Sequence, residues 1–377
     1  MAPMHRSRLM SRTRWLAVLL TVLSSAAPAA QNRSAAAAER AGWTAIRVGQ
    51  AQEAAAAFRD ALRLEPRSAE SMLGAGLAEF LLGQLDDARQ HLETALQVDP
   101  SMTEASRLLG YVLYRKGDVD GAMQVYEQAL TRAPADAMIA SRLDAWRHEA
   151  ELHGRFNQRL GDHFTVLFEG PAEEAIAART VELLEAAYWR IGTAIGTFPS
   201  EPITVILYTQ EQFKDITRSP SWAAGAYDGR IRVPMRGALQ NPRELDRILC
   251  HEFTHALVHG VAPRGVPQWL NEGLALLFEP SRTPAADNAP LRAHGPAGAV
   301  VPLTRLEDSF EGLSDDEARR AYVESGDAVQ ALVAQSGMPA ILNLLQNLGT
   351  GMRFDDAFER SIGMRYEEFQ RVWSQPR

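Results

Sequence analysis

Cysteine is nearly absent from this chain of 377 residues, which contains only Cys250. A lone cysteine cannot form an intramolecular disulfide, and no cysteine near residue 29 is available to carry a lipid. A disulfide-stabilised fold is therefore excluded. In an oxidising compartment the stability of this chain must come from packing.

The chain also lacks an excess of basic residues and a long apolar run. Its 39 Lys and Arg residues are outnumbered by 47 Asp and Glu residues, which gives a formal charge of −8 and argues against nucleic acid as a partner. No apolar segment reaches the roughly 20 residues that a spanning helix needs. We therefore expect no stable membrane span once the N-terminal segment has been cleaved.

The first 29 residues have the pattern of a secretory signal peptide. An apolar run from Trp15 to Leu23 is followed by small residues at Ala27-Pro28-Ala29, and it is preceded by four arginines: Arg6, Arg8, Arg12 and Arg14. Cleavage after residue 29 would change the formal charge from −8 to −12. We expect an exported protein, periplasmic or secreted; the alternative is that the apolar run is kept as an anchor.

Residues 35–136 repeat with a period of 34. Six positions keep their character in three copies: Gly42/Gly76/Gly110, Gly49/Gly83/Gly117, Ala54/Ala88/Ala122, Phe58/Leu92/Tyr126, Ala61/Ala95/Ala129 and Pro66/Pro100/Pro134. Small residues let two helices approach closely, the bulky residue fills the space between them, and glycine and proline mark the turns. The pattern predicts three helix-turn-helix units and resembles the tetratricopeptide repeat (TPR) family. A groove that binds a protein partner is the functional interpretation, and a structural spacer is the alternative.

Apolar residues at helical spacing continue beyond the third repeat at Ile139, Leu143 and Trp146. They predict a helix that caps the array against solvent, so we assign residues 35–150 to the repeats with their cap. Contacts between domains are usually fewer than contacts within them. A fragment that begins near residue 151 is therefore expected to fold and bind metal without the repeats.

After about residue 150 the pattern changes to short strands and helices. Residues 164–170 and 203–209 are β-branched and aromatic runs, and residues 172–195 between them carry an apolar helical stripe. Residues 230–235 alternate Ile231 and Val233 with charged residues, which predicts a third strand with one solvated face. These features indicate an α+β domain over residues 151–377.

The motif HEFTH occupies residues 251–255 in a predicted helix that begins with a capping pattern at residues 241–244 and runs to about Gly260. His251 and His255 are one helical turn apart, so both imidazoles project from one face and can share a metal ion. Glu252 lies between them in sequence and can reach a water on that ion. Apolar residues beside the histidine face indicate that it points inward, which argues against a surface helix with two histidines.

A catalytic zinc site needs a third protein ligand beside an open position. His259 fails on distance, because eight residues of helix place it about 12 Å from His251. The metzincin pattern fails as well, because valines occupy the positions of its glycine and third histidine. Glu272 remains. It lies on a second predicted helix that begins at Pro267, and we expect Gly273 to let that helix pack closely against the histidine helix.

HEFTH followed by WLNEGLA, with its glutamate 17 residues after the second histidine, resembles the gluzincin or peptidase MA-like family in its TPR-bearing bacterial branch. The likeness runs from about His163 to Trp373 and includes the strand within residues 225–234. It implies an all-α TPR solenoid followed by a zincin-like α+β domain with a small mixed sheet and C-terminal helices. It also implies Zn²⁺ on His251, His255 and Glu272, with Glu252 as general base and the substrate extended along the edge strand.

Two further residues lie in or near these motifs. Tyr322 belongs to a Tyr-x-x-Ser pair on a helix opened by a capping box at residues 314–317, and it could donate a hydrogen bond to the tetrahedral intermediate. A packed tyrosine is the alternative. Cys250 points about 100° away from His251 around the helix, so a buried apolar role is expected. The Pro-, Gly- and Ala-rich residues 281–302 are expected to be a loop, either a lid or a disordered segment.

Together these observations predict a zinc-dependent endopeptidase that acts on a peptide or protein substrate. The alternative is an envelope scaffold in which TPR repeats bind a partner and the metal domain is catalytically silent. Structural zinc sites are usually closed by four ligands, mostly cysteine, and they do not need Glu252. The sequence therefore favours the enzyme.

Overall fold

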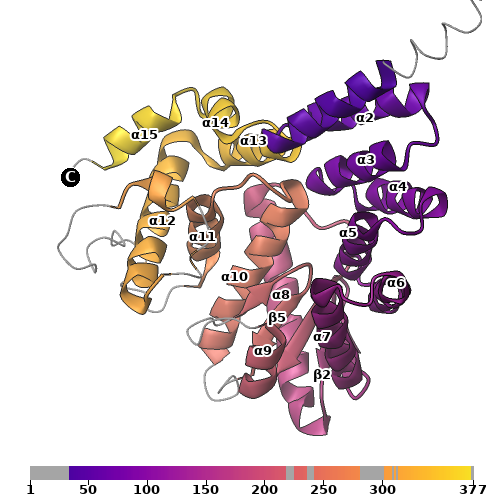
Figure 1. The fold of residues 1–377 in the computed structure, drawn as a ribbon. Coiled ribbons are helices and arrows are strands. Elements are labelled where there is room, and N and C mark those ends of the chain that lie inside the picture. Colours follow the sequence, from indigo (N-terminus) through magenta and orange to yellow (C-terminus); the bar gives the residue numbers. More distant parts are fainter. Residues whose placement is uncertain are drawn as a thin grey trace, which may run out of the picture.

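The computed structural model describes residues 34–217, 225–235, 242–280, 301–307, 310 and 313–374 (Figure 1). The expected signal peptide and residues 281–300 of the expected loop over residues 281–302 lie outside the described residues. Within them, no single helix is long and apolar enough to span a membrane. One pair of helices, Asp316–Ser336 and Met338–Gly349, meets those limits together but is bent by 110°.

The N-terminal part is a stack of antiparallel helices (Figure 1). It consists of a helix over residues 34–47, then α2 (Ala51–Leu64), α3 (Ala69–Leu81), α4 (Leu85–Val98), α5 (Thr103–Arg115), α6 (Val119–Arg132) and α7 (Ala137–His153). The turn glycines Gly49, Gly83 and Gly117 have φ values of 76°, 75° and 83°, which favour glycine. A Cβ on Gly42 would lie 2.7 Å from the Phe58 ring. The predicted repeat of close helix pairs is confirmed.

A five-stranded mixed sheet follows, in the order β1-β2-β3-β5-β4. The strands are β1 (Asn157–Leu160), β2 (Phe164–Phe168), β3 (Ile203–Tyr208), β4 (Ala226–Tyr227) and β5 (Ile231–Pro234). The three central strands are parallel, and β1 and β4 pair antiparallel at the two edges. A short 3₁₀ turn (Pro171–Glu173) and α8 (Glu174–Ile195) connect β2 to β3, and α9 (Gln210–Thr217) follows β3.

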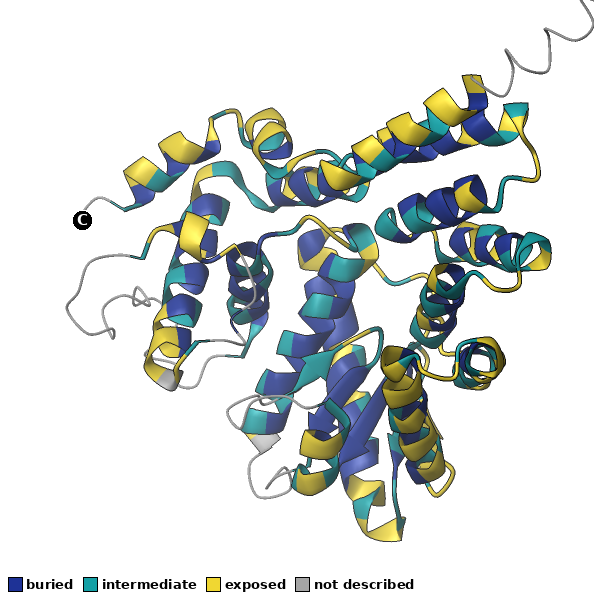
Figure 2. Cartoon of the chain, viewed as in Figure 1, coloured by how far each residue is buried: buried dark blue, intermediate teal, exposed yellow. Residues whose placement is uncertain are grey.

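Helices cover both faces of this sheet. Alternate residues such as Val205, Leu207 and Val233 pack with α8 and with α10 (Pro242–Val261) in the largest apolar cluster. The intervening residues Ile206 and Tyr208 face the other way, where they pack with residues of α7 and α9. Figure 2 shows the central strands as largely buried between these helices. The sheet thus supports α10, the helix that carries the HEFTH motif.

The helix α7 does more than cap the repeats. Its first half supplies Ile139, Leu143 and Trp146 to the core of the array, as predicted. Its last turns supply Leu152 to the cluster on the sheet. The capping prediction, which rested on these three residues, therefore agrees with the packing of the first half of α7, and its C-terminal half in addition covers the second face of the sheet.

The strand β5 differs from its prediction, which gave it one solvated face. All four of its residues are buried, including Arg232, which is only 1% exposed. It pairs on both sides, with β3 and β4, so β4 is the edge strand on this side of the sheet. The guanidinium of Arg232 is accommodated by polar groups of α5 and α7, which the repeat pattern did not reveal.

The C-terminal part is a bundle of short helices. It consists of α11 (Gln268–Phe278), the 3₁₀ turn Leu303–Arg305, α12 (Asp315–Ser336), α13 (Met338–Gly349), α14 (Phe354–Ile362) and α15 (Tyr366–Trp373). The predicted capping box of Ser314 and Glu317 opens α12. A Cβ on Gly273 would collide with the Ser325 carbonyl and with Val329. Gly273 therefore permits close packing of α11 on α12, and the expectation that it serves the contact with α10 is wrong.

Candidate metal centre

The structure brings together the two histidines of α10 and the glutamate of α11. The Nε2 atoms of His251 and His255 lie 3.2 and 3.6 Å from the same atom, Glu272 Oε2. One ligand atom from each residue lies within 4.8 Å of the others. Three potential ligands of the types that zinc prefers therefore converge from two neighbouring helices.

The other ring nitrogen of each histidine is held by an oxygen. His251 Nδ1 lies 2.8 Å from Glu279 Oε1, and His255 Nδ1 lies 3.0 Å from Asn271 Oδ1. With a cation at the centre, these acceptors would hold the remaining proton of each ring on Nδ1, which would leave both Nε2 lone pairs directed at the cation. Such partners orient metal-binding histidines and make them more basic.

The glutamates are themselves held in place. Gln268 donates to Glu272 Oε1 at 2.8 Å, one helical turn away on α11. Arg247 donates to Glu279 at 2.8 Å and to both carboxylate oxygens of Glu244 at 2.7 and 3.1 Å. A chain of charge-assisted contacts thus runs from the start of α10 to His251 and fixes the direction of its ring.

The pKa shifts of His251 and Glu272 indicate which charge the cluster stabilises. Burial opposes the charged form of His251, but Glu272 and Glu279 outweigh it and raise the pKa of His251 to about 10. Burial disfavours the ionised form of Glu272, but His255 and His251 hold its pKa well below its usual range. The cluster is therefore arranged to hold positive charge around one carboxylate oxygen.

A divalent cation fits this arrangement. Glu272 Oε2 is buried and receives no hydrogen bond, although Glu272 is only 6% exposed. A buried carboxylate oxygen without a donor is costly unless a cation satisfies it. Two imidazoles and one carboxylate form the ligand set of a catalytic zinc site with one position open. The residues present therefore fit the metal that the sequence predicts.

Glu252 lies beside the cluster without belonging to it. The side chain is 5% exposed and lies on the turn of α10 that carries both histidines. A Cβ on Gly225 would lie 2.5 Å from Glu252 Oε1, so the chain just before β4 approaches this carboxylate closely. Burial raises the pKa of Glu252 and the neighbouring carboxylates add to this, whereas His255 and His251 oppose it.

Tyr322, on α12, lies within electrostatic range of the same carboxylates. Burial raises its pKa, and Glu272, Glu252 and Glu279 raise it further. Its ring also packs edge-on against Phe310 at 5.6 Å. The contact with Phe310 agrees with a packed ring, and the influence of the three carboxylates agrees with a hydrogen-bond donor beside the site.

The remaining candidates lie away from the centre. His259 contacts Arg115 and packs near the Tyr227 ring, so it does not join the histidine cluster. Cys250 is buried as predicted, but its Sγ accepts a hydrogen bond from Arg190 at 3.0 Å, so its surroundings are not purely apolar.

Sequence reasoning missed Asn271, Glu279, Gln268 and Arg247. Helical spacing contained a usable pattern, because Gln268 and Glu279 stand four residues before and seven residues after Glu272, which places all three near one face. Asn271 directly precedes Glu272. Arg247 lies one turn before His251.

Comparisons with known proteins agree with these observations. The family model described as the Peptidase MA superfamily matches residues 185–376, and the tetratricopeptide repeat model matches residues 39–100 and 82–137. No curated protein matches the chain.

Two solved structures are similar to part of the chain. The Arabidopsis OM64 TPR domain is 17% identical, and the first TPR of Spaghetti (RPAP3), bound to an HSP90 peptide, is 18% identical. Each match covers 32% of this chain and 98% of the other chain, with a TM-score of 0.31.

Proposed function

This chain belongs to the Peptidase MA superfamily and carries TPR repeats before its peptidase domain, and from this premise we propose that it is a zinc-dependent endopeptidase. The observation that carries the proposal is the convergence of His251 Nε2, His255 Nε2 and Glu272 Oε2, with both Nδ1 atoms held by oxygens. The three residues would be the zinc ligands. Glu252, which is buried beside them, would be the general base.

The proposed reaction is hydrolysis of an amide bond. Bound zinc would lower the pKa of a water and polarise the scissile carbonyl. The Glu252 carboxylate accepts the proton from the attacking water and later gives it to the leaving amine. Gly225 keeps the backbone before β4 close to Glu252, so a peptide paired with that edge would pass directly over the base.

Tyr322 is proposed to assist by donating a hydrogen bond to the oxygen that becomes negative in the transition state. Support comes from Glu272, Glu252 and Glu279, which raise the pKa of Tyr322 and are therefore near enough to interact with its hydroxyl. Tyr322→Phe would lower kcat and leave KM and the zinc content unchanged. An unchanged kcat would assign the residue to packing with Phe310.

We further propose that the array binds a protein partner or the substrate itself. TPR repeats support protein–protein interaction, and nucleic acid is not expected because the chain is acidic. The protein is proposed to act in the periplasm or outside the cell after removal of residues 1–29. The N-terminal residue of the protein recovered from the exported fraction would test this: Ala30 supports cleavage, and Met1 contradicts it.

The metal and the activity can be tested together. The purified protein should contain one zinc per chain, and a chelator should abolish hydrolysis of a peptide library until zinc is added back. His255→Ala should lose both zinc and activity because it deletes a ligand. A wild-type protein that holds one zinc but cleaves no peptide in the library would favour the scaffold.

A further inference from the structure

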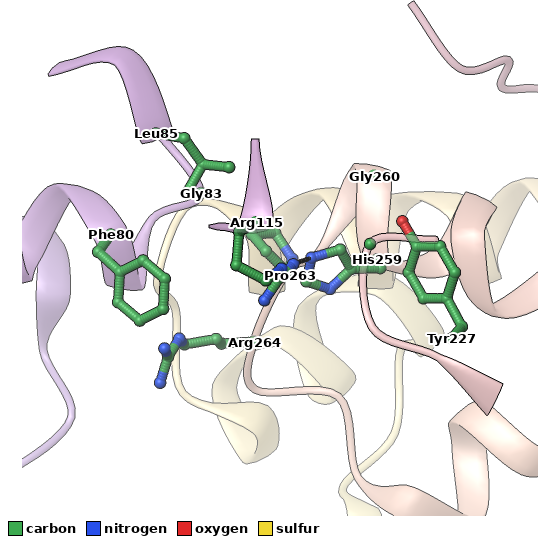
Figure 3. Close-up of a pocket in the computed structure, with 10 residues that line it drawn as sticks. Phe80, Gly83, Leu85, Arg115, Tyr227, His259, Gly260, Pro263 and Arg264 are labelled. Atoms are coloured by element: carbon green, nitrogen blue, oxygen red, sulfur yellow. Dashed lines mark hydrogen bonds between the residues drawn. The ribbon is translucent and has the colours of Figure 1, made fainter. Parts of the chain in front are cut away.

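A cavity of about 210 Å³ lies where the repeat array meets the C-terminal end of the histidine helix (Figure 3). The array contributes Phe80 and Arg115, the β4–β5 hairpin contributes Tyr227, and the segment from the end of α10 contributes His259 and Arg264. In Figure 3 Arg115 extends toward the His259 ring, and Tyr227 lies on the far side of that ring. The cavity is therefore built by both parts of the chain.

The cavity has an unbalanced positive charge. Among the described residues, no acidic residue lines the cavity, and the acids next in sequence to its lining residues Leu85 and Gly229 pair with other cations: Asp86 with Lys116, and Asp228 with Arg232. Arg115 Nε is buried without a hydrogen-bond acceptor, and the Arg264 guanidinium lies 4.3 Å from the centroid of the Phe80 ring. Two guanidinium groups thus face a space that contains no protein anion.

His259 adds no negative charge to the cavity and does not take a proton at neutral pH. Its Nε2 accepts a hydrogen bond from Arg115. Burial, with help from Arg115 and Arg264, lowers the pKa of His259 to about 4. The net charge of this group of side chains near pH 7 is therefore positive, which suits an anion with planar, bidentate geometry such as a carboxylate.

The position of the cavity connects it with the metal centre. Gly225, just before β4, lies beside Glu252, whereas Tyr227 and Gly229, two and four residues further along the chain, line the cavity. An extended chain advances about 3.3 Å per residue, so a peptide paired with β4 would reach from Glu252 to the cavity in two to four residues. Among the described residues no strand occupies the outer edge of β4.

We propose that this cavity is a carboxylate subsite, formed jointly by the repeat array and the peptidase domain, that selects peptides with a carboxylate two to four residues from the cleaved bond. The inference rests on the proposed peptidase function for its connection to cleavage. The array thereby contributes Arg115 directly to substrate recognition. Binding of the carboxylate itself does not depend on catalysis, so the subsite can be tested separately.

The test uses pairs of peptides that differ only in one Glu or Gln, placed at each of four positions on either side of the cleaved bond. The wild type should cleave the Glu peptide at one register with a kcat/KM about tenfold higher, because only the carboxylate can form a charge-assisted hydrogen bond with a guanidinium of the cavity. Arg115→Gln and Arg264→Gln should each reduce this preference, measured as the ratio of kcat/KM for the Glu peptide to kcat/KM for the Gln peptide in the same variant. Arg132→Gln, at an exposed arginine of α6, is the matched control.

Because Arg115 is partly buried, the exposed Arg264→Gln keeps the test valid if Arg115→Gln does not fold. Peptides with free and amidated C-termini distinguish a side-chain carboxylate from a terminal one. If the wild type cleaves no peptide, the dissociation constants of the same fluorescent peptides are compared directly. Equal cleavage or equal binding of the Glu and Gln peptides at every position overturns the subsite, and efficient cleavage without that preference leaves the peptidase proposal standing.

Discussion

Two buried polar clusters in this molecule differ in how completely their hydrogen bonds are made. Around Arg232, every guanidinium nitrogen donates: Nε to Asp228, Nη1 to Tyr208, and Nη2 to Tyr114 and Glu149. Around Glu272, one carboxylate oxygen faces two imidazole nitrogens and receives no hydrogen bond. Both clusters are withdrawn from solvent, since Arg232, Glu149 and Glu272 are 1%, 3% and 6% exposed.

The difference separates a structural cluster from a binding site. Each buried side-chain nitrogen and oxygen of the Arg232 cluster has a partner within the protein, so we assign this cluster to the contact of α5 and α7 with the sheet. In the Glu272 cluster the buried carboxylate oxygen has no hydrogen-bond donor within the described part of the chain, so a cation bound there would stabilise it. Burial alone would not have distinguished them, and neither would the presence of ionisable residues.

Removal of the array should have the largest effect on this comparison. A fragment of residues 151–377 loses Glu149 and Tyr114, and it keeps only the last three residues of α7, so Leu152 loses the helix that holds it against the sheet. We therefore expect it to be insoluble or partly unfolded, contrary to the modularity that the sequence suggested. A fragment of residues 137–377 keeps α7 and should show more native circular dichroism. Equal folding and zinc content of the two fragments would contradict the structural role of α7.

The second-largest effect is expected when the Arg232 cluster is broken within the full-length chain. Glu149→Ala leaves Arg232 and Arg230 without their buried partner, and loss of one member of such a pair costs about 3–5 kcal/mol. Urea unfolding measures the change. Asp60→Ala, which removes an exposed pair with Arg63, should change the free energy of unfolding little. A similar small change for Glu149→Ala would show that this network does not stabilise the fold.

Changes to the supporting residues of the incomplete cluster should spare the fold and weaken the metal site. Asn271→Ala removes the oxygen that orients His255, and Glu279→Gln weakens the acceptor of His251. Each should lower zinc affinity by about 10–100-fold, as is usual for partners of metal ligands. Competition with a chelating dye measures the affinity. Asn347→Ala, which removes a contact with Ser361 away from the site, should leave it unchanged.

Acid should weaken the complete cluster through His153. Tyr208 accepts a hydrogen bond from Arg232, and its hydroxyl lies 2.7 Å from His153 Nε2, so a neutral His153 can accept the hydroxyl proton. Burial, together with Arg232 and Arg230, lowers the pKa of His153 to about 4 against the opposing effect of Glu149. The unfolded chain, with a pKa of about 6.5, then binds a proton that the folded chain does not.

The stability that His153 contributes is therefore present above about pH 6.5 and lost as the pH falls toward 4, by at most about 1.4 kcal/mol per pH unit. His153→Gln should flatten the dependence of the unfolding free energy on pH in this window. The exposed His148→Gln, on the same helix, should not. Equal slopes in both variants would show that His153 is protonated or exposed in the folded state.

The same comparison explains how far the sequence could predict the structure. The repeats were predictable because each helix packs on its sequence neighbours, so a period of 34 contains most of the contacts. The spacing of His251, His255 and Glu272 predicted a cluster that the structure does bring together. Contacts between distant segments were not predictable in this way. The alternation around Arg232 indicates an exposed face unless Glu149, 83 residues earlier in the chain, is known to lie opposite.

The central claim is that the incomplete cluster is a catalytic zinc site, and Glu252→Gln tests it most directly. Glu252 is not a proposed ligand, so the variant should keep one zinc per chain and the wild-type unfolding curve. Hydrolysis should fall by about 10²–10⁴-fold, because the acceptor of the water proton is lost. A Glu252→Gln protein that binds zinc and cleaves peptides as fast as the wild type would contradict the mechanism.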